Sequence, residues 1–242
     1  MESHTVDNHG EKRAIGPLCR DHTCVSRLEN ALSVLSNVFP EFSRTLAGTT
    51  VGFVLLSDPG VNSFAADALH GLSFLSVPRH CSVPYFVEDV LHQCGHIMFS
   101  SMCLASSGIW SGDDQTPIST YTRNGRDTRS VSVVWHAVFT EYLIAEGLLR
   151  CLKLQIFTGQ DEAEAMGRLT FVLKKSQSDL RTLYLLPSSD DELKLRESLS
   201  AEFARIVEEA APSMYLAFDI SDQPYNFDFD LFCERNGLQP IS

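Results

Sequence analysis

The sequence predicts an α+β fold that is predominantly α-helical, with a small β-hairpin or sheet near the N-terminal third packed on a helical scaffold. Long segments of the C-terminal half repeat apolar residues every three or four positions, which is the spacing of amphipathic helices. Two short β-branched runs occur before residue 80, each followed by proline. With 242 residues, 44% of them hydrophobic, the chain can bury one substantial core.

The N-terminal third is expected to hold a leader, one helix and two strands. Residues 1–16 are polar and lack apolar periodicity, which predicts a disordered leader ahead of a single domain over residues 17–242. Residues 25–39 have helical spacing and end at Pro40. Residues 49–57 and 72–77 are the two predicted strands, and we expect them to pair.

Four helices are predicted beyond the strands, and they form the scaffold that carries the candidate metal site. They cover residues 85–106, 131–157, 160–186 and 190–211. Residues 107–129 lack periodicity, and an ordered loop of that length is usually functional. Residues 219–242 alternate phenylalanines with acids in part, so we expect an extended segment laid across the body.

Charge and cysteine content argue against several classes of function. Nineteen basic and thirty-one acidic residues give a net charge of −12, so we expect neither nucleic acid nor a membrane as a partner. No segment approaches the roughly 18 apolar residues that span a bilayer, and residues 1–16 lack the apolar core of a secretory signal. The seven cysteines are irregularly spaced, which favours reduced thiols and a cytoplasmic protein.

His92 and His96 are candidate metal ligands. They are four residues apart, so on a helix they project from one face about a turn apart and can share an ion. Gly95 between them costs a helix up to about 1 kcal/mol relative to alanine, a cost tolerated where another backbone or a ligand approaches closely. Such a pair also occurs as hydrogen-bonded core histidines, and that alternative stays open.

Gln93 occupies the position where zinc peptidases carry a glutamate. That glutamate polarises a metal-bound water and receives its proton. An amide is no general base at neutral pH, whereas the flanking histidines keep their capacity to bind a metal. The sequence therefore argues against a peptidase while leaving a metal site possible.

His136 is the candidate third ligand, because it lies in a strongly apolar helical segment where a buried histidine needs a partner. The alternative is a core histidine bonded to a carbonyl or to Glu141. His70 is a weaker candidate, and His22 lies between two cysteines at a spacing that fits no common zinc site.

Three loop arginines could bind an anionic ligand: Arg123, Arg126 and Arg129. They are concentrated in one loop of an acidic chain, and a guanidinium can hold a carboxylate through two hydrogen bonds. Solvated loop charges are the alternative.

Together these residues resemble the HExxH-type 2-oxoglutarate-dependent peptide β-hydroxylases, iron enzymes of natural product biosynthesis, over roughly residues 48–155. One part of the match is a strand region around Gly71 followed by the His92 to His96 motif. The other is the spacing from Arg129 to His136 at the start of a long apolar helix. The chain departs from the family in Gln93 for glutamate, in a serine for the proline after Arg129, and in its short length.

The resemblance implies a metal-dependent dioxygenase that uses Fe(II), 2-oxoglutarate and dioxygen to hydroxylate an unactivated carbon of a peptidyl or amino-acid-like substrate. Its implied iron ligands are His92, His96 and His136. Its implied 2-oxoglutarate-binding residues are Arg129, Arg123 and Arg126. Three imidazole ligands suit Fe(II) and leave positions open for the 2-oxo acid and oxygen. Gln93 would hydrogen-bond a ligand or the substrate.

Two other functions remain open. A zincin-like zinc hydrolase would need a displaced general base, for which Glu88, Asp89 and Glu141 are the candidates. A non-catalytic helical binding protein would use the histidines for structure only, and alanine at His92 and His136 would then leave metal content unchanged.

Overall fold

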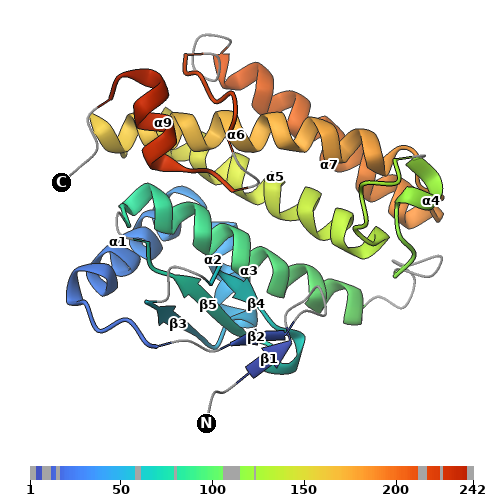
Figure 1. Ribbon diagram of the computed structural model, residues 1–242, viewed down its shortest axis with the longest axis horizontal. Helices are drawn as coiled ribbons and strands as arrows, with labels where there is room; N and C mark the ends of the chain where they lie inside the picture. Colours follow the sequence, from blue (N-terminus) through green and yellow to red (C-terminus); the bar gives the residue numbers. More distant parts are fainter. Residues whose placement is uncertain are drawn as a thin grey trace.

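Two long helices form the centre of the structure, α3 (Val83–Ala105) and α5 (Val131–Lys153). The computed structural model describes residues 4–6, 12–14, 17–57, 61–78, 81–105, 115–122, 124–211, 217–223 and 226–238. Helix α3 packs on α1 (His22–Val38) and α2 (Pro40–Thr49), while α5 packs on α6 (Gln160–Leu183) and α7 (Asp190–Glu209). Figure 1 shows α3 between the small sheet on one side and α5, α6 and α7 on the other. Both central helices are therefore buried along most of their length.

The small sheet is mixed and packs against α3. Strands β3 (Gly52–Leu56) and β5 (Leu72–Ser76) are parallel, and the two-residue β4 (Phe64–Ala65) is antiparallel to the other edge of β5. The predicted pairing of the two strands is confirmed. The connection between them is a crossover rather than a hairpin, because the strands run in the same direction.

The predicted helices are confirmed, and polar caps account for where several of them begin. The Asp21 carboxylate accepts the Thr23 backbone N–H at the start of α1. The Ser130 hydroxyl does the same for α5, and Ser189 and Glu192 form a reciprocal capping box at α7. The predominantly helical α+β fold class is therefore confirmed.

Several elements differ from the prediction. Pro40 was expected to end a helix, but it also begins α2, because proline fits the first turn of a helix. The tail contains helix α9 (Phe229–Asn236) where an extended segment was expected. Residues 1–16 include two three-residue antiparallel strands, β1 (His4–Val6) and β2 (Lys12–Ala14), too short for periodicity to reveal. Short helical turns also occur at η1 (Asp67–Leu69) and α4 (Ser119–Thr122).

Helix α9 lies across α6, where Gly167 leaves room for it (Figure 1). A Cβ atom at Gly167 would stand 2.6 Å from the Phe232 ring, so only glycine permits this approach. The Asp228 side chain caps the start of α9, and Gly237, at φ +65°, ends it in the left-handed conformation.

Gly95 marks a close approach of α3 to α5. A Cβ atom there would lie 3.0 Å from side-chain carbons of both Thr140 and Leu143. The expectation of a crowded site at this glycine is confirmed.

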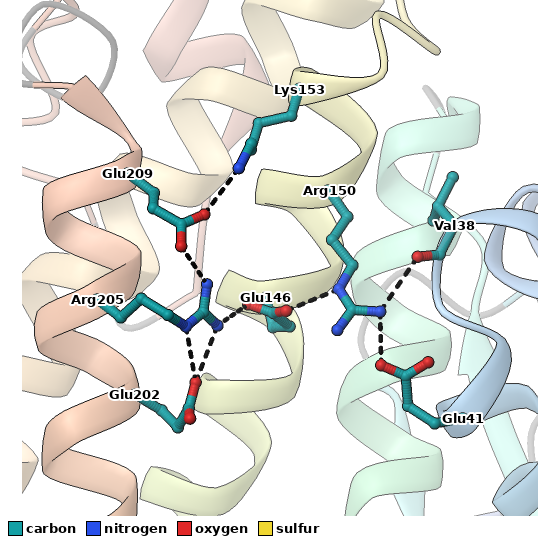
Figure 2. Close-up of polar contacts among 8 residues, drawn as sticks. All are labelled: Val38, Glu41, Glu146, Arg150, Lys153, Glu202, Arg205 and Glu209. Atoms are coloured by element: carbon teal, nitrogen blue, oxygen red, sulfur yellow. Dashed lines mark hydrogen bonds and ion pairs between the residues drawn. The ribbon is translucent and has the colours of Figure 1, made fainter.

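Glu146 is the centre of an ion-pair network that joins α5 to α7 and α2 (Figure 2). Its side chain is buried, and its two oxygens lie 2.6 Å from Arg150 and 2.6 Å from Arg205. Arg150 also pairs with Glu41 of α2 at 2.6 Å, and Arg205 with Glu202 at 2.9 Å. The Glu146 carboxylate therefore pairs with two arginines, of which Arg150 contacts α2 and Arg205 belongs to α7.

All seven cysteines are free thiols in the structure. The Sγ atoms of Cys24 and Cys81 lie 3.1 Å apart in the core, the separation of a thiol hydrogen bond rather than a disulfide. Among the described helices, none is both long enough and apolar enough to cross a membrane.

Candidate functional site

A cavity of about 450 Å³ lies between α3, α5 and α6, and its lining includes His92, Gln93, His96 and the three candidate displaced bases. Its polar lining includes Glu88, Asp89, His92, Gln93, His96, Thr140, Glu141, Arg168 and Lys175. Its apolar lining includes Phe64, Val133, Ala137, Ile144, Phe171 and Val172. This volume lies in the range of small-molecule sites, about 300–1,000 Å³.

The candidate metal ligands lie in a row beside this cavity. His96 of α3 and His136 of α5 are 40 residues apart in sequence, yet their Nδ1 atoms are 3.1 Å apart. The ring of His92 is 5.0 Å from that of His96, and the ring of His136 is 5.3 Å from it on the other side. His96 and His136 are buried, whereas His92 is half-buried. Their predicted proximity is therefore observed.

The separation of His96 and His136 is compatible with a shared ion. Two imidazole nitrogens bound to one ion through bonds of about 2.1 Å stand about 3.0–3.4 Å apart, depending on the coordination angle. The same distance suits a direct hydrogen bond between the rings. As placed, the histidines, cysteines and acids of the described residues form no group of three or more that could hold a metal. A three-histidine site would need the His92 ring to turn toward the other two.

Gln93 links Asp89 to His92. Its amide nitrogen lies 3.3 Å from His92 Nδ1 and 3.5 Å from Asp89 Oδ1. This contact bears on the tautomer of His92. If Nδ1 accepts a hydrogen bond from the amide N–H, the ring proton of the neutral imidazole is on Nε2. Gln93 thus contacts a candidate metal ligand, His92.

Asp89 is a buried carboxyl on the cavity wall. It accepts a 2.6 Å hydrogen bond from the Ser63 hydroxyl. Burial nevertheless raises the pKa of Asp89 to about 7, because the charged form is desolvated. A carboxyl with such a pKa can exchange a proton near neutral pH.

Asp89→Asn is expected to change how stability depends on pH. The pKa of Asp89 rises from 3.8 to about 7 on folding, so ionisation costs the folded state nothing below pH 4 and the full penalty above pH 7. Relative to wild type, the variant should gain stability between these limits, by up to about 1.4 kcal/mol per pH unit. Urea denaturation at pH 4 and pH 7 measures the gain, with Asp191→Asn on the exposed face of α7 as control. A difference independent of pH contradicts the raised pKa.

Glu141 of α5 and Lys175 of α6 lie next to each other on the cavity wall. The Lys175 Nζ atom lies 3.4 Å from Glu141 Oε1. Burial raises the pKa of Glu141 well above its usual range, although the positive charge of Lys175 opposes that rise. From the sequence, Glu141 was expected only as a possible partner of His136 or as a displaced base. Lys175 was not predicted, because helical spacing does not show which charge faces a cavity.

Arg168 is a second cation that sequence analysis missed. Its guanidinium is buried and pairs with Glu88 at 2.5 Å and with Glu164 at 2.6 Å. It also lies over the rings of Tyr85 and Phe227, at 5.2 and 4.8 Å from their centroids. Two carboxylates thus balance this charge and hold it in place.

Two of the predicted 2-oxoglutarate-binding arginines, Arg126 and Arg129, lie at a neighbouring cavity of about 690 Å³ rather than with the histidines. Arg129 makes two hydrogen bonds to Asp127, at 3.0 and 2.9 Å, and one to Asp179 at 2.8 Å. Burial opposes the charge of Arg129, but these bonds raise its pKa. Arg126 is exposed on the wall of the same cavity, and Arg123 lies outside the described residues. Lys175 lines both cavities.

The two weaker candidate histidines, His70 and His22, lie away from the cavity lining. His70 is exposed, and its Nε2 atom is 3.0 Å from the Ser101 hydroxyl. His22 is exposed at the first position of α1.

Comparison with known proteins finds no family model that matches the chain and no curated protein that matches it in sequence. By its fold and its cavity, the chain is a predominantly helical α+β protein with a histidine-lined cavity of small-molecule size between α3, α5 and α6.

Proposed function

We propose that the protein is a non-haem oxygenase that depends on Fe(II) and 2-oxoglutarate and hydroxylates an unactivated carbon of a peptidyl or amino-acid-like substrate. The observation that carries this proposal is the approach of His96 to His136, 40 residues apart in sequence, beside a cavity that His92 and His96 line. The resemblance of these residues to the peptide β-hydroxylases supports it. A glutamate base is not required for this chemistry, which is consistent with Gln93.

In this proposal His92, His96 and His136 hold the ion. Bound Fe(II), together with 2-oxoglutarate and dioxygen, supplies the oxidation that replaces C–H by C–OH, while 2-oxoglutarate becomes succinate and carbon dioxide. The protein orients the ligands and the substrate. Apolar side chains such as Val133, Ala137 and Ile144 hold the carbon chain of the substrate and exclude water.

Gln93 orients the His92 ring in this proposal. Coordination through Nε2 requires that Nδ1 of His92 carry the proton. The Gln93 carbonyl oxygen can accept a hydrogen bond from this N–H if the amide turns by 180°, since the oxygen and nitrogen then exchange places. Gln93 is thus a positioning residue rather than a base.

We retain Arg129, with Arg126 and Arg123, as the proposed binding residues for the 2-oxoglutarate carboxylate. The pairing of Arg129 with Asp127 and Asp179 means that the co-substrate would bind beside these carboxylates or displace one of them. The seven free thiols favour a reducing compartment, so we further propose a cytoplasmic location.

A zinc hydrolase is the second candidate, and one observation favours it. Asp89 and Glu141, two of the candidate displaced bases, line the same cavity as His92 and His96. The pKa of Asp89, about 7, is also suited to a general base. Such an enzyme would act without oxygen and contain zinc as purified.

Anaerobic titration of the purified protein with Fe(II) and 2-oxoglutarate tests the proposal. We expect a weak visible charge-transfer band that saturates at one iron per chain. Succinate in place of 2-oxoglutarate is the matched control, because it lacks the 2-oxo group and should give no band. A folded protein that shows no band, or that contains zinc and cleaves a substrate without oxygen, contradicts the oxygenase.

A further inference from the structure

Glu141 is a buried acid whose hydrogen-bonding capacity is not used within the described residues. Its side chain lines the cavity and is 2% exposed. Neither Oε1 nor Oε2 has a hydrogen-bond partner among the described residues. A buried carboxylate without donors is costly, because desolvation is not offset. The position is therefore suited to a ligand that brings N–H donors.

Lys175 places a positive charge at the same point of the cavity. Its distance of 3.4 Å from Glu141 Oε1 exceeds the roughly 2.7–2.9 Å of a charge-assisted hydrogen bond. An ammonium group beside Glu141 and a carboxylate beside Lys175 would give each residue a shorter, opposite-charge contact. A zwitterion offers both groups within one small molecule.

Of the charged side chains that line this cavity, Glu141 alone has buried oxygens without a hydrogen-bond partner among the described residues. Arg168 pairs with Glu88 and Glu164, and Asp89 accepts the Ser63 hydroxyl. Glu141, with the positive charge of Lys175 beside it, is therefore the acid most suited to a ligand. An internal aliphatic residue of a peptide carries neither a free ammonium nor a free carboxylate and could not satisfy both.

Apolar side chains surround this pair on the same two helices. Ala137 and Ile144 are four residues before and three after Glu141 on α5, and Phe171 and Val172 precede Lys175 by four and three on α6. Residues at these spacings share a helix face. An aliphatic side chain attached to the zwitterion would contact them.

We propose that the cavity binds a free aliphatic α-amino acid, with Glu141 accepting its ammonium group and Lys175 holding its carboxylate. This inference rests on the proposed function for the ligand's role as the substrate, but the binding itself needs neither metal nor 2-oxoglutarate. The cavity of about 450 Å³ is at the lower end of small-molecule sites, as such a ligand requires.

Isothermal titration of the full-length, metal-free protein tests the inference. Alanine, valine, leucine and isoleucine, as L-amino acids, are the first probes. The tightest binder is then compared with its desamino acid and its decarboxylated amine, which for leucine are 4-methylpentanoate and 3-methylbutylamine. We expect each analogue to bind about ten- to a hundredfold more weakly, since each loses one charge-assisted contact.

Two variants separate the contacts. Glu141→Gln should weaken binding of the amino acid and of the amine about ten- to a hundredfold and leave binding of the desamino acid unchanged. Lys175→Met should weaken binding of the amino acid and of the desamino acid and leave binding of the amine unchanged. Glu197→Gln, on the exposed side of α7, is the matched control and should change none of them.

The inference is overturned if none of the four amino acids binds at millimolar concentration, if the desamino acid binds wild type as tightly as the amino acid, or if Glu141→Gln weakens all three ligands equally. If a variant fails to fold, the affinities of the wild-type protein for the amino acid, the desamino acid and the amine still test the inference. Amino acid binding without a charge-transfer band would support this inference while contradicting the oxygenase. A charge-transfer band without amino acid binding would support the oxygenase and contradict this inference.

Discussion

His136→Ala is expected to weaken Fe(II) binding by at least about a hundredfold, because loss of a ligand should exceed the 10–100-fold effect of losing a residue that merely orients one. His136 is buried, and it is the residue that α5 brings within 3.1 Å of His96. Anaerobic titration with Fe(II), followed by metal analysis of the desalted protein, measures the change. Circular dichroism verifies that the variant is folded.

The matched control for this variant is His70→Ala. His70 is exposed and interacts with Ser101, away from the cavity, so iron binding should stay at the wild-type level. His92→Ala tests the third ligand: an effect as large as that of His136→Ala supports three histidines, whereas unchanged binding removes His92 from the ligand set. If His136→Ala binds iron as wild type does, the metal site itself is refuted.

Glu146→Gln is expected to destabilise the protein by about 3 kcal/mol. Removal of one partner from a buried ion pair costs about 3–5 kcal/mol, and the lower end applies here because Arg150 and Arg205 both reach solvent. Figure 2 shows that the carboxylate stands between the two arginines, so both lose their buried partner at once. Unfolding in urea, extrapolated to water, measures the loss.

Glu202→Gln is the control for the network. Glu202 pairs with the same Arg205 but is 41% exposed, so its loss should cost less than about 1 kcal/mol. Equal effects of the two substitutions would show that burial of Glu146 contributes nothing. The loss from Glu146→Gln is large beside a typical total stability of about 5–15 kcal/mol.

Helical periodicity predicted most of the architecture, because the central helices bury apolar residues on faces that recur every three to four positions. It missed α2 and α9 for local reasons. Pro40 both follows one helix and starts the next, and the phenylalanines and acids of the tail alternate closely enough to suggest an extended chain. In α9, Phe229, Phe232 and Cys233 are instead three and four residues apart and share one buried face.

The candidate site was predictable where chemistry depends on local spacing. His92 and His96 share a helix face because they are four residues apart, and Gln93 is adjacent to His92 in any conformation. The position of Arg129 was not predictable. Its guanidinium is engaged by Asp127 two residues away and by Asp179 fifty residues away, and only the first of these is local.

The sequence by itself determined which residues could bind a metal, that Gln93 removes a peptidase base, and that the chain forms long helices beside a small sheet. Tertiary structure decided which of these residues meet. His136 reaches His96, and Glu141 faces Lys175, because α3, α5 and α6 pack side by side, with Gly95 allowing α3 and α5 to approach closely. Contacts between helices depend on packing angles and side-chain volumes across the whole core, which a one-dimensional pattern does not specify.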